Sequence, residues 1–175
     1  MTPEQQATLK AYILADPAWA ALPLNSDTSY FIADELSKEA SPAFVVWKTS
    51  VSADEIMRNG MDWARVDNLT AGKARIWDWT GRLGSFDCSK PNVRAGIDAT
   101  WVGTAADLAV RATVYTHCKR TSTRFERLFS SGTGSDAAPA TMGTDATGRV
   151  IEGPAGDFNL NLPAATAAAG LIRIA

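Results

Sequence analysis

The chain has 175 residues, of which 46% are hydrophobic and 21% charged, and its formal net charge is −2. This composition is typical of one soluble globular domain and excludes a disordered chain, while the near-neutral charge argues against a protein whose main role is to wrap DNA. Two cysteines are too few for a disulfide framework, and no apolar run approaches the roughly 20 residues that span a bilayer. The polar stretch MTPEQQATLK does not resemble a secretion signal, so we expect a protein that is made in a cytoplasm and used or assembled there.

Helix-start signals recur along the chain. The stretch Thr2-Pro3-Glu4-Gln5 combines a capping box with proline at the first helical position, and it predicts a helix that ends at Asp16-Pro17. Similar polar residues ahead of apolar stripes predict further helices that begin at Ser26 or Asp27, at Ser52, at Thr70 and near Ser89. The one strand candidate is AFVVWKTSV, residues 43–51, which is rich in β-branched and aromatic side chains and is equally compatible with an extended connection.

The longest predicted helix runs over residues 104–130. It begins with the capping pair Thr104 and Asp107, and its apolar face then carries Val110, Val114, Cys118, Thr121, Phe125 and Leu128. Basic residues crowd toward its C-terminal end, where they complement the negative end of the helix dipole: Lys119, Arg120, Arg124 and Arg127. We therefore predict a mainly α fold, a small helical bundle over residues 1–130 that is organised around this long helix.

After Ser130 the composition changes. Residues 131–175 are rich in Gly, Ala, Thr and Pro, so they are predicted to form an extended C-terminal arm that cannot build its own core. Within this arm Phe158, Leu160 and Leu162 alternate with polar residues, which is the pattern of an extended segment with one buried face. We expect this stretch to bind a neighbouring protein by strand addition.

No pattern of residues indicates catalysis or a bound cofactor. His117 and Cys118 are adjacent, so on a helix they diverge by about 100° and cannot act together as base and nucleophile. We interpret them as a surface histidine beside a core cysteine. One histidine and two cysteines give no zinc spacing, and GTGSD follows a helix and lacks the lysine of a phosphate loop. Carboxylate pairs such as Asp54-Glu55 fall in helix starts. We predict no catalytic residue, no metal and no cofactor, and hence no enzyme.

Tryptophans and arginines are the candidate interaction residues. Trp77 and Trp79 project from opposite sides of one predicted helix, so a small core does not easily hold both. Trp and Arg are enriched at interface anchors, although an aromatic-rich core within one monomer is equally compatible with this spacing. The arginines are interpreted as a solvated or intersubunit face, with a surface for nucleic-acid phosphates as the alternative. The predicted interface comprises Trp77, Trp79, Trp101, Arg120, Arg124, Arg127, Phe158, Leu160 and Leu162.

Four stretches together resemble one known family: SPAFVVWKTSV, VDNLTAGKARIWDW, KPNVRAGIDATWVGT and RFERLFSSGTGSDAAPATM. The family is that of small structural proteins of tailed bacteriophages and prophages, and the resemblance covers most of residues 1–142. Residues 143–175 depart from the family's pattern. The resemblance implies a virion protein that is assembled in the cytoplasm of a bacterial host, and it brings no catalytic motif.

The chain is also similar, more loosely, to the head–tail adaptor proteins of these phages. Those proteins are small helical bundles with one long helix and an extended terminal arm. The similarity implies a ring of copies of this chain, twelve by analogy, that binds a portal or tail protein. Packaged DNA would pass through the ring without sequence-specific binding, and no membrane takes part. Subunits of such a ring meet through heterologous contacts, so each needs two different faces.

Other roles stay open from the sequence. Within a phage particle the alternatives are a tail-completion, baseplate or capsid decoration protein. From another class, a small phage enzyme such as a nuclease needs clustered carboxylates or a histidine-based site. A DNA-binding regulator needs a basic domain with a helix-turn-helix. Neither pattern is visible in the sequence.

Overall fold

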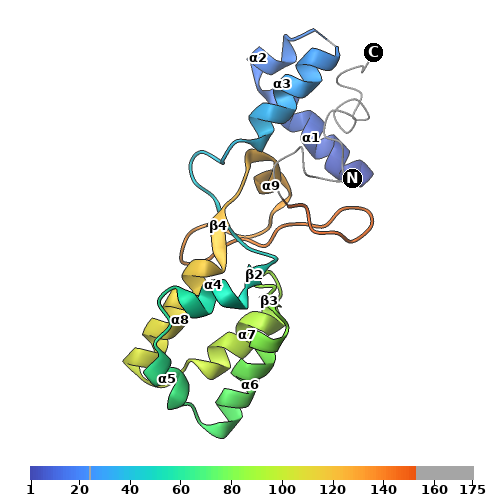
Figure 1. Ribbon diagram of the computed structural model, residues 1–175. Coiled ribbons are helices and arrows are strands. Elements are labelled where there is room, and N and C mark those ends of the chain that lie inside the picture. Colours follow the sequence, from blue (N-terminus) through green and yellow to red (C-terminus); the bar gives the residue numbers. More distant parts are fainter. Residues whose placement is uncertain (24, 153–175) are drawn as a thin grey trace. The chain divides into compact units, whose positions relative to one another are not determined.

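The fold is mainly α, in agreement with the helical periods of the sequence. The computed structural model describes residues 1–23 and 25–152, and Figure 1 shows their elements. The chain divides into two compact units. We call Val46–Arg120 the central unit. We call Met1–Val45 together with the segment from Thr121 onward the split unit, because its two parts are far apart in sequence.

Each unit has its own set of helices. The split unit contains α1 (Pro3–Ala15), α2 (Pro17–Ala20), α3 (Ser26–Ser37) and α9 (Arg124–Phe129). The central unit contains α4 (Ala53–Arg58), α5 (Trp63–Asp67), α6 (Ala71–Arg82), α7 (Pro91–Thr100), α8 (Ala105–His117), and the antiparallel strands β2 (Val51–Ser52) and β3 (Ser85–Phe86). β1 (Val45–Trp47) pairs with β4 (Lys119–Thr121), and the chain passes between the units along these strands. The strand candidate 43–51 thus contains β1 and the first residue of β2.

Side-chain caps set where several helices begin. At α1 the Gln5 N–H donates to Thr2 Oγ1 at 3.2 Å, and the Gln5 side chain accepts in return, which completes the predicted capping box. At α4 the predicted cap Ser52 accepts from the Glu55 N–H at 2.9 Å. The sequence predicts Ser26 or Asp27 as the cap of α3, whereas the structure has Asn25 there, which accepts from the Thr28 N–H at 2.9 Å. Short polar side chains therefore satisfy the free N–H groups at these helix starts.

The single long helix predicted over residues 104–130 is wrong. α8 ends before Cys118, the chain then forms β4, and a second capping box of Thr123 with Glu126 begins α9. At the end of α8 the backbone groups pair with a neighbouring strand instead of continuing the helix, since the Cys118 carbonyl accepts from the Lys48 N–H at 2.8 Å. Two helices on either side of a short break can keep the apolar spacing of one helix, which explains the error.

The core of the split unit joins the distant parts of its sequence. Phe125 of α9 is fully buried, and its ring meets that of Phe129 edge to face with 5.0 Å between centroids. The buried cluster consists of Leu9, Ile13, Ile32, Ala33, Leu36, Phe125 and Ile151. Because α1, α3, α9 and the segment after α9 share this cluster, neither part of the split unit buries its apolar face without the other.

Residues 131–152 fold as part of the split unit, where the sequence predicts the beginning of a free arm. The Gly134 carbonyl accepts from the Val45 N–H at 2.7 Å. Gly134 also has a φ of +64°, and a side chain at this position would collide with the ring of Phe44. The glycines here thus permit close packing on an apolar surface, a role that composition alone does not distinguish from mobility. The rest of the predicted arm, residues 153–175, lies outside the described residues.

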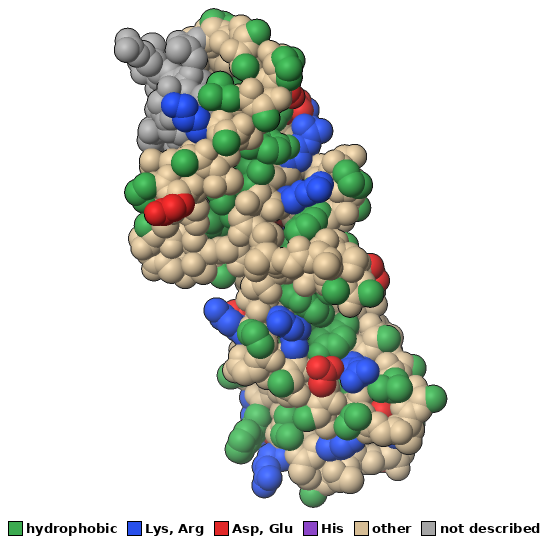
Figure 2. All heavy atoms as spheres, turned by 180° about the vertical axis from the view of Figure 1, so that it is seen from behind, with side chains coloured by type: hydrophobic (Ala, Val, Ile, Leu, Met, Phe, Trp, Pro, Cys, Tyr) green, Lys and Arg blue, Asp and Glu red, His purple; other side chains and the backbone are tan. Residues whose placement is uncertain are grey.

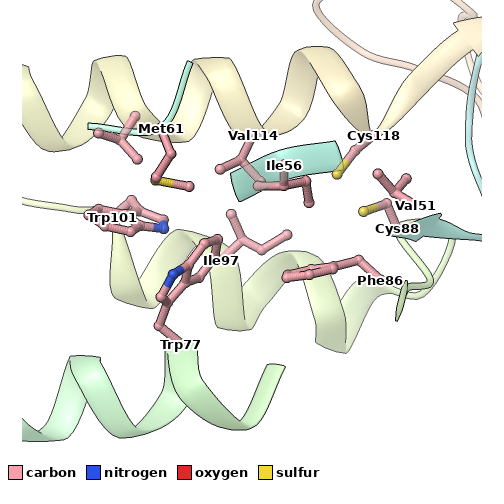
Figure 3. Packing of buried hydrophobic residues seen from close by; sticks show 11 residues of the cluster. Val51, Ile56, Met61, Trp77, Phe86, Cys88, Ile97, Trp101, Val114 and Cys118 are labelled. Carbon is pink, nitrogen blue, oxygen red and sulfur yellow. The ribbon is translucent and has the colours of Figure 1, made fainter. Parts of the chain in front are cut away.

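The central unit has an aromatic core, which Figure 3 shows from close by. Trp77 of α6 meets Trp101 edge to face with 5.2 Å between centroids, and its ring lies 5.7 Å from that of Phe86. The cluster consists of Val51, Ile56, Met61, Trp77, Phe86, Cys88, Ile97, Trp101, Val110, Val114 and Cys118. These residues come from α4, α6, α7, α8, the short sheet and the segments that connect them, so residues 46–120 contain a complete core.

Candidate interaction surfaces

Two of the predicted interface residues belong to the core instead. Trp77 is 4% exposed and Trp101 is fully buried, because their rings pack on each other inside the central unit. Trp79, on the other side of the same helix, is 64% exposed. The structure therefore separates tryptophans that the sequence groups together. The predicted interface residues Phe158, Leu160 and Leu162 lie outside the described residues.

The outer side of α6 carries an exposed apolar row. Ile76, Trp79 and Leu83 recur at spacings of three and four residues, which places them on one side of the helix. Leu83 is 73% exposed, and the Arg75 guanidinium lies 6.0 Å from the centroid of the Trp79 ring. We call Ile76, Trp79 and Leu83 the α6 face. A large aromatic ring with a cation beside it is the combination that is typical of interface anchors.

The split unit exposes a second aromatic pair, on α3. Tyr30 is 64% exposed and Phe31 is 48% exposed, whereas Ile32 and Leu36 of the same helix are buried. We call Tyr30 and Phe31 the α3 face. Figure 2 shows that hydrophobic side chains reach the surface in many places on the side that it presents. Covering such rings with a partner removes apolar area from water and is favourable.

Two of the predicted arginines, Arg124 and Arg127, line a groove of the split unit and are held by that unit. A groove of about 400 Å³ is lined by Tyr12, Ala40, Ser41, Pro42, Arg124, Arg127 and Leu128. Arg124 Nη1 lies 3.2 Å from Glu35 Oε2, and Arg127 Nη1 donates to the Pro42 carbonyl at 3.3 Å. Arg120 is half-buried in β4. These contacts give an amphipathic groove, and they weaken the interpretation of the arginines as a track for nucleic-acid phosphates.

A second groove, on the central unit, is not predicted from the sequence. It has a volume of about 310 Å³ and is lined by Met57, Val66, Leu69, Ala74, Trp77, Asp78, Gly81 and Arg82. Asp78 and Arg82 form an ion pair of 2.9 Å on α6. The sequence feature that indicates this groove is a pair of small residues on one side of α6, Ala74 and Gly81. They leave room beside Met57 of α4.

His117 and Cys118 face different surroundings, as predicted. His117 is half-buried rather than at the open surface, with Nε2 2.9 Å from the Asn59 carbonyl oxygen and Nδ1 3.5 Å from Glu55 Oε1. Cys118 is fully buried, and its hydrogen bond with Cys88 and its burial raise the pKa of the Cys118 thiol, which disfavours a reactive thiolate. Within residues 1–23 and 25–152, no three metal-binding side chains gather into a group.

Asp107 is a buried carboxylate of the central unit. Its side chain is 7% exposed and accepts from Arg65 Nε at 3.2 Å and from the Thr104 N–H at 3.1 Å. The hydrogen bond from Arg65, followed by those from Thr104, holds the pKa of Asp107 below its ordinary value of 3.8. The cap with Thr104 is predicted from the sequence, but no spacing rule connects Arg65 to Asp107.

We expect Asp107→Asn to lower the melting temperature at neutral pH, because the Arg65 guanidinium loses its charged partner. Folding favours the ionised carboxylate, so its stabilisation is fully present above the unfolded-state pKa near 3.8 and is lost as the pH falls through the lower folded-state pKa. Thermal melts from neutral to acidic pH test this, with Asp67→Asn as the control at an exposed carboxylate of α5. A deficit of Asp107→Asn that stays constant over this pH range would contradict the assignment.

Comparisons of the chain with protein-family models, with curated proteins and with solved structures find no match. Among the described residues, every helix is too short or too polar to traverse a lipid bilayer. The surface features that bear on function are the α6 face, the α3 face and the grooves beside Arg124 and beside Trp77.

Proposed function

We propose that the protein is a structural subunit of a tailed-phage particle and, more narrowly, a head–tail adaptor that assembles into a ring. The stretches SPAFVVWKTSV and KPNVRAGIDATWVGT, which resemble phage structural proteins, support the class. In this proposal the small helical bundle of an adaptor corresponds to the packed helices of the central unit. The two shorter helices α8 and α9 stand in place of the one long helix.

The proposal of a ring is supported by two exposed apolar faces, which lie on different units. A closed ring needs heterologous contacts, in which one patch of each subunit meets a different patch of the next. The α6 face and the α3 face differ in residue content and belong to different units, so they satisfy this requirement. We propose that the α6 face of one copy binds the α3 face of the next.

The C-terminal residues provide the docking element in this proposal. Residues 153–175 include Phe158, Leu160 and Leu162, whose alternation with polar residues suits strand addition to a portal or tail protein. The ring would number twelve copies by analogy and would let packaged DNA pass through its centre. A tail-completion, baseplate or capsid decoration role differs from this one in the partner that the C-terminal residues bind.

Native mass spectrometry of two variants tests the ring. The first carries Trp79→Ser with Leu83→Ser, and the second carries Tyr30→Ser with Phe31→Ser. We expect the unmodified chain to form closed oligomers and each variant to remain monomeric, because losing a buried aromatic anchor weakens an interface roughly 30-fold or more. Mixing the two variants should restore one interface and give pairs, since each supplies the face that the other lacks.

Leu14→Ser is the control, because it removes an exposed apolar side chain that belongs to neither face. This variant should assemble as the unmodified chain does, and all the variants should melt at nearly the same temperature. An unmodified chain that stays monomeric at high concentration and with candidate portal and tail proteins would overturn the proposal. If either variant forms dimers by itself, the contact between copies is symmetric and the proposed heterologous contact is wrong.

A further inference from the structure

The two cysteines of the chain, 30 positions apart in sequence, meet in the core of the central unit. Cys88 follows β3, and Cys118 caps the C-terminal end of α8. Both side chains are fully buried as free thiols. Figure 3 shows their sulfur atoms pointing toward one another, between Val51 and Ile56.

Backbone contacts hold both cysteines in place. The Cys118 N–H donates to the Val114 carbonyl at 3.2 Å, and its carbonyl accepts from Lys48, which fixes the end of α8. The carbonyl of Cys88 accepts from Arg94 Nη1 at 2.6 Å. Pairing of β2 with β3 fixes the segment just before Cys88. A disulfide needs two cysteines whose side chains already approach each other, and this arrangement provides such a pair.

We propose that Cys88 and Cys118 form an intramolecular disulfide in the folded chain when a small-molecule disulfide oxidises them. The thiolate of one cysteine attacks a sulfur of the oxidant, forms a mixed disulfide and releases the first thiolate of the oxidant. The second cysteine attacks the protein sulfur of that mixed disulfide and releases the second. The protein loses two electrons and two protons, and the oxidant is reduced to two thiols.

The bond would connect the start of α7 to the end of α8 without a change of fold. It would close a loop through α7 and α8, the two helices that contribute Ile97, Val110 and Val114 to the core. A closed loop restricts the unfolded chain, so the oxidised central unit should melt several degrees above the reduced one. Burial makes the exchange slow, because the thiols react only during transient opening of the core.

The test uses the purified full-length chain, folded and reduced, and oxidised glutathione as the oxidant. After quenching with acid, the protein is denatured, its remaining thiols are labelled with a maleimide, and its intact mass is measured. We expect a monomer that carries no label and is lighter by two hydrogen atoms, with one peptide pair joining Cys88 to Cys118. Dithiothreitol should return both the label sites and the original melting temperature.

Single variants separate this pairing from other oxidation products. Cys88→Ser and Cys118→Ser should each yield a chain that retains one glutathione and gains no thermal stability from the oxidant. The proposal is overturned if the unmodified folded chain keeps both labels, retains glutathione, links only to a second copy, or forms the bond only after denaturation. These outcomes are read on the isolated chain, so they are independent of the proposed role in a phage particle.

Discussion

A chain that ends at Ser130 is expected to lose the folded state of the split unit. The truncation removes the buried side chains of Met142 and Ile151, and with them the hydrogen bond that Val45 makes to the segment after α9. Burying two such side chains contributes roughly 3–6 kcal/mol, which is a large share of the 5–15 kcal/mol that stabilises a typical domain. Circular dichroism and urea unfolding should show a lower helix content and the loss of one unfolding transition.

A chain that ends at Glu152 is the matched control for this truncation. It keeps every described residue of the split-unit core and removes the segment that the proposed function assigns to docking. We therefore expect an unchanged urea midpoint, together with loss of recruitment by a portal or tail protein. If the chain that ends at Ser130 unfolds as the full chain does, residues 131–152 are a dispensable arm after all.

Trp101→Ala is expected to destabilise the central unit by about 3–5 kcal/mol, because it leaves a large cavity where a fully buried ring packs against Trp77. The indole N–H of Trp101 has no acceptor among the described residues, so the loss is one of packing rather than of a hydrogen bond. Urea unfolding monitored by tryptophan fluorescence and by circular dichroism measures the change.

Trp79→Ala is the control for this substitution, since it removes the same side chain from a position that is 64% exposed. Its effect on the free energy of unfolding should stay within about 0.5 kcal/mol. If the two substitutions lower the free energy of unfolding equally, the assignment of Trp101 to the core and of Trp79 to the surface is wrong. If Trp79→Ala strongly weakens oligomer formation and leaves the free energy of unfolding unchanged, the result agrees with the proposed α6 face.

The sequence predicts several helix starts correctly. Thr2, Ser52 and Thr104 each cap a helix as predicted, because a cap is a local hydrogen bond between residues three positions apart. The break between α8 and α9 is missed, although Thr123 and Glu126 form a capping box that the sequence also displays. The apolar period across the break outweighs that local signal, and the strand partner that interrupts the helix lies far away in sequence.

For the candidate surfaces, the sequence identifies residue types but not their environments. The spacing places Trp77 and Trp79 on opposite sides of α6, yet it does not say which side faces the core. That depends on Phe86 and Trp101, which other elements bring to the inner side. The approach of Cys88 to Cys118 is a contact of the same kind, between distant residues, and no local pattern encodes it.

The discontinuous sequence of the split unit has a consequence for the order of synthesis on the ribosome. Residues 46–120 form one continuous stretch, so they can complete their core as soon as they emerge. The helices α1 and α3 appear earlier, but the core that they share with Phe125 and Ile151 cannot close until the last part of the chain has been translated. The first helices made are thus among the last to be buried, and their apolar sides stay open to chaperones while the middle of the chain is already folded.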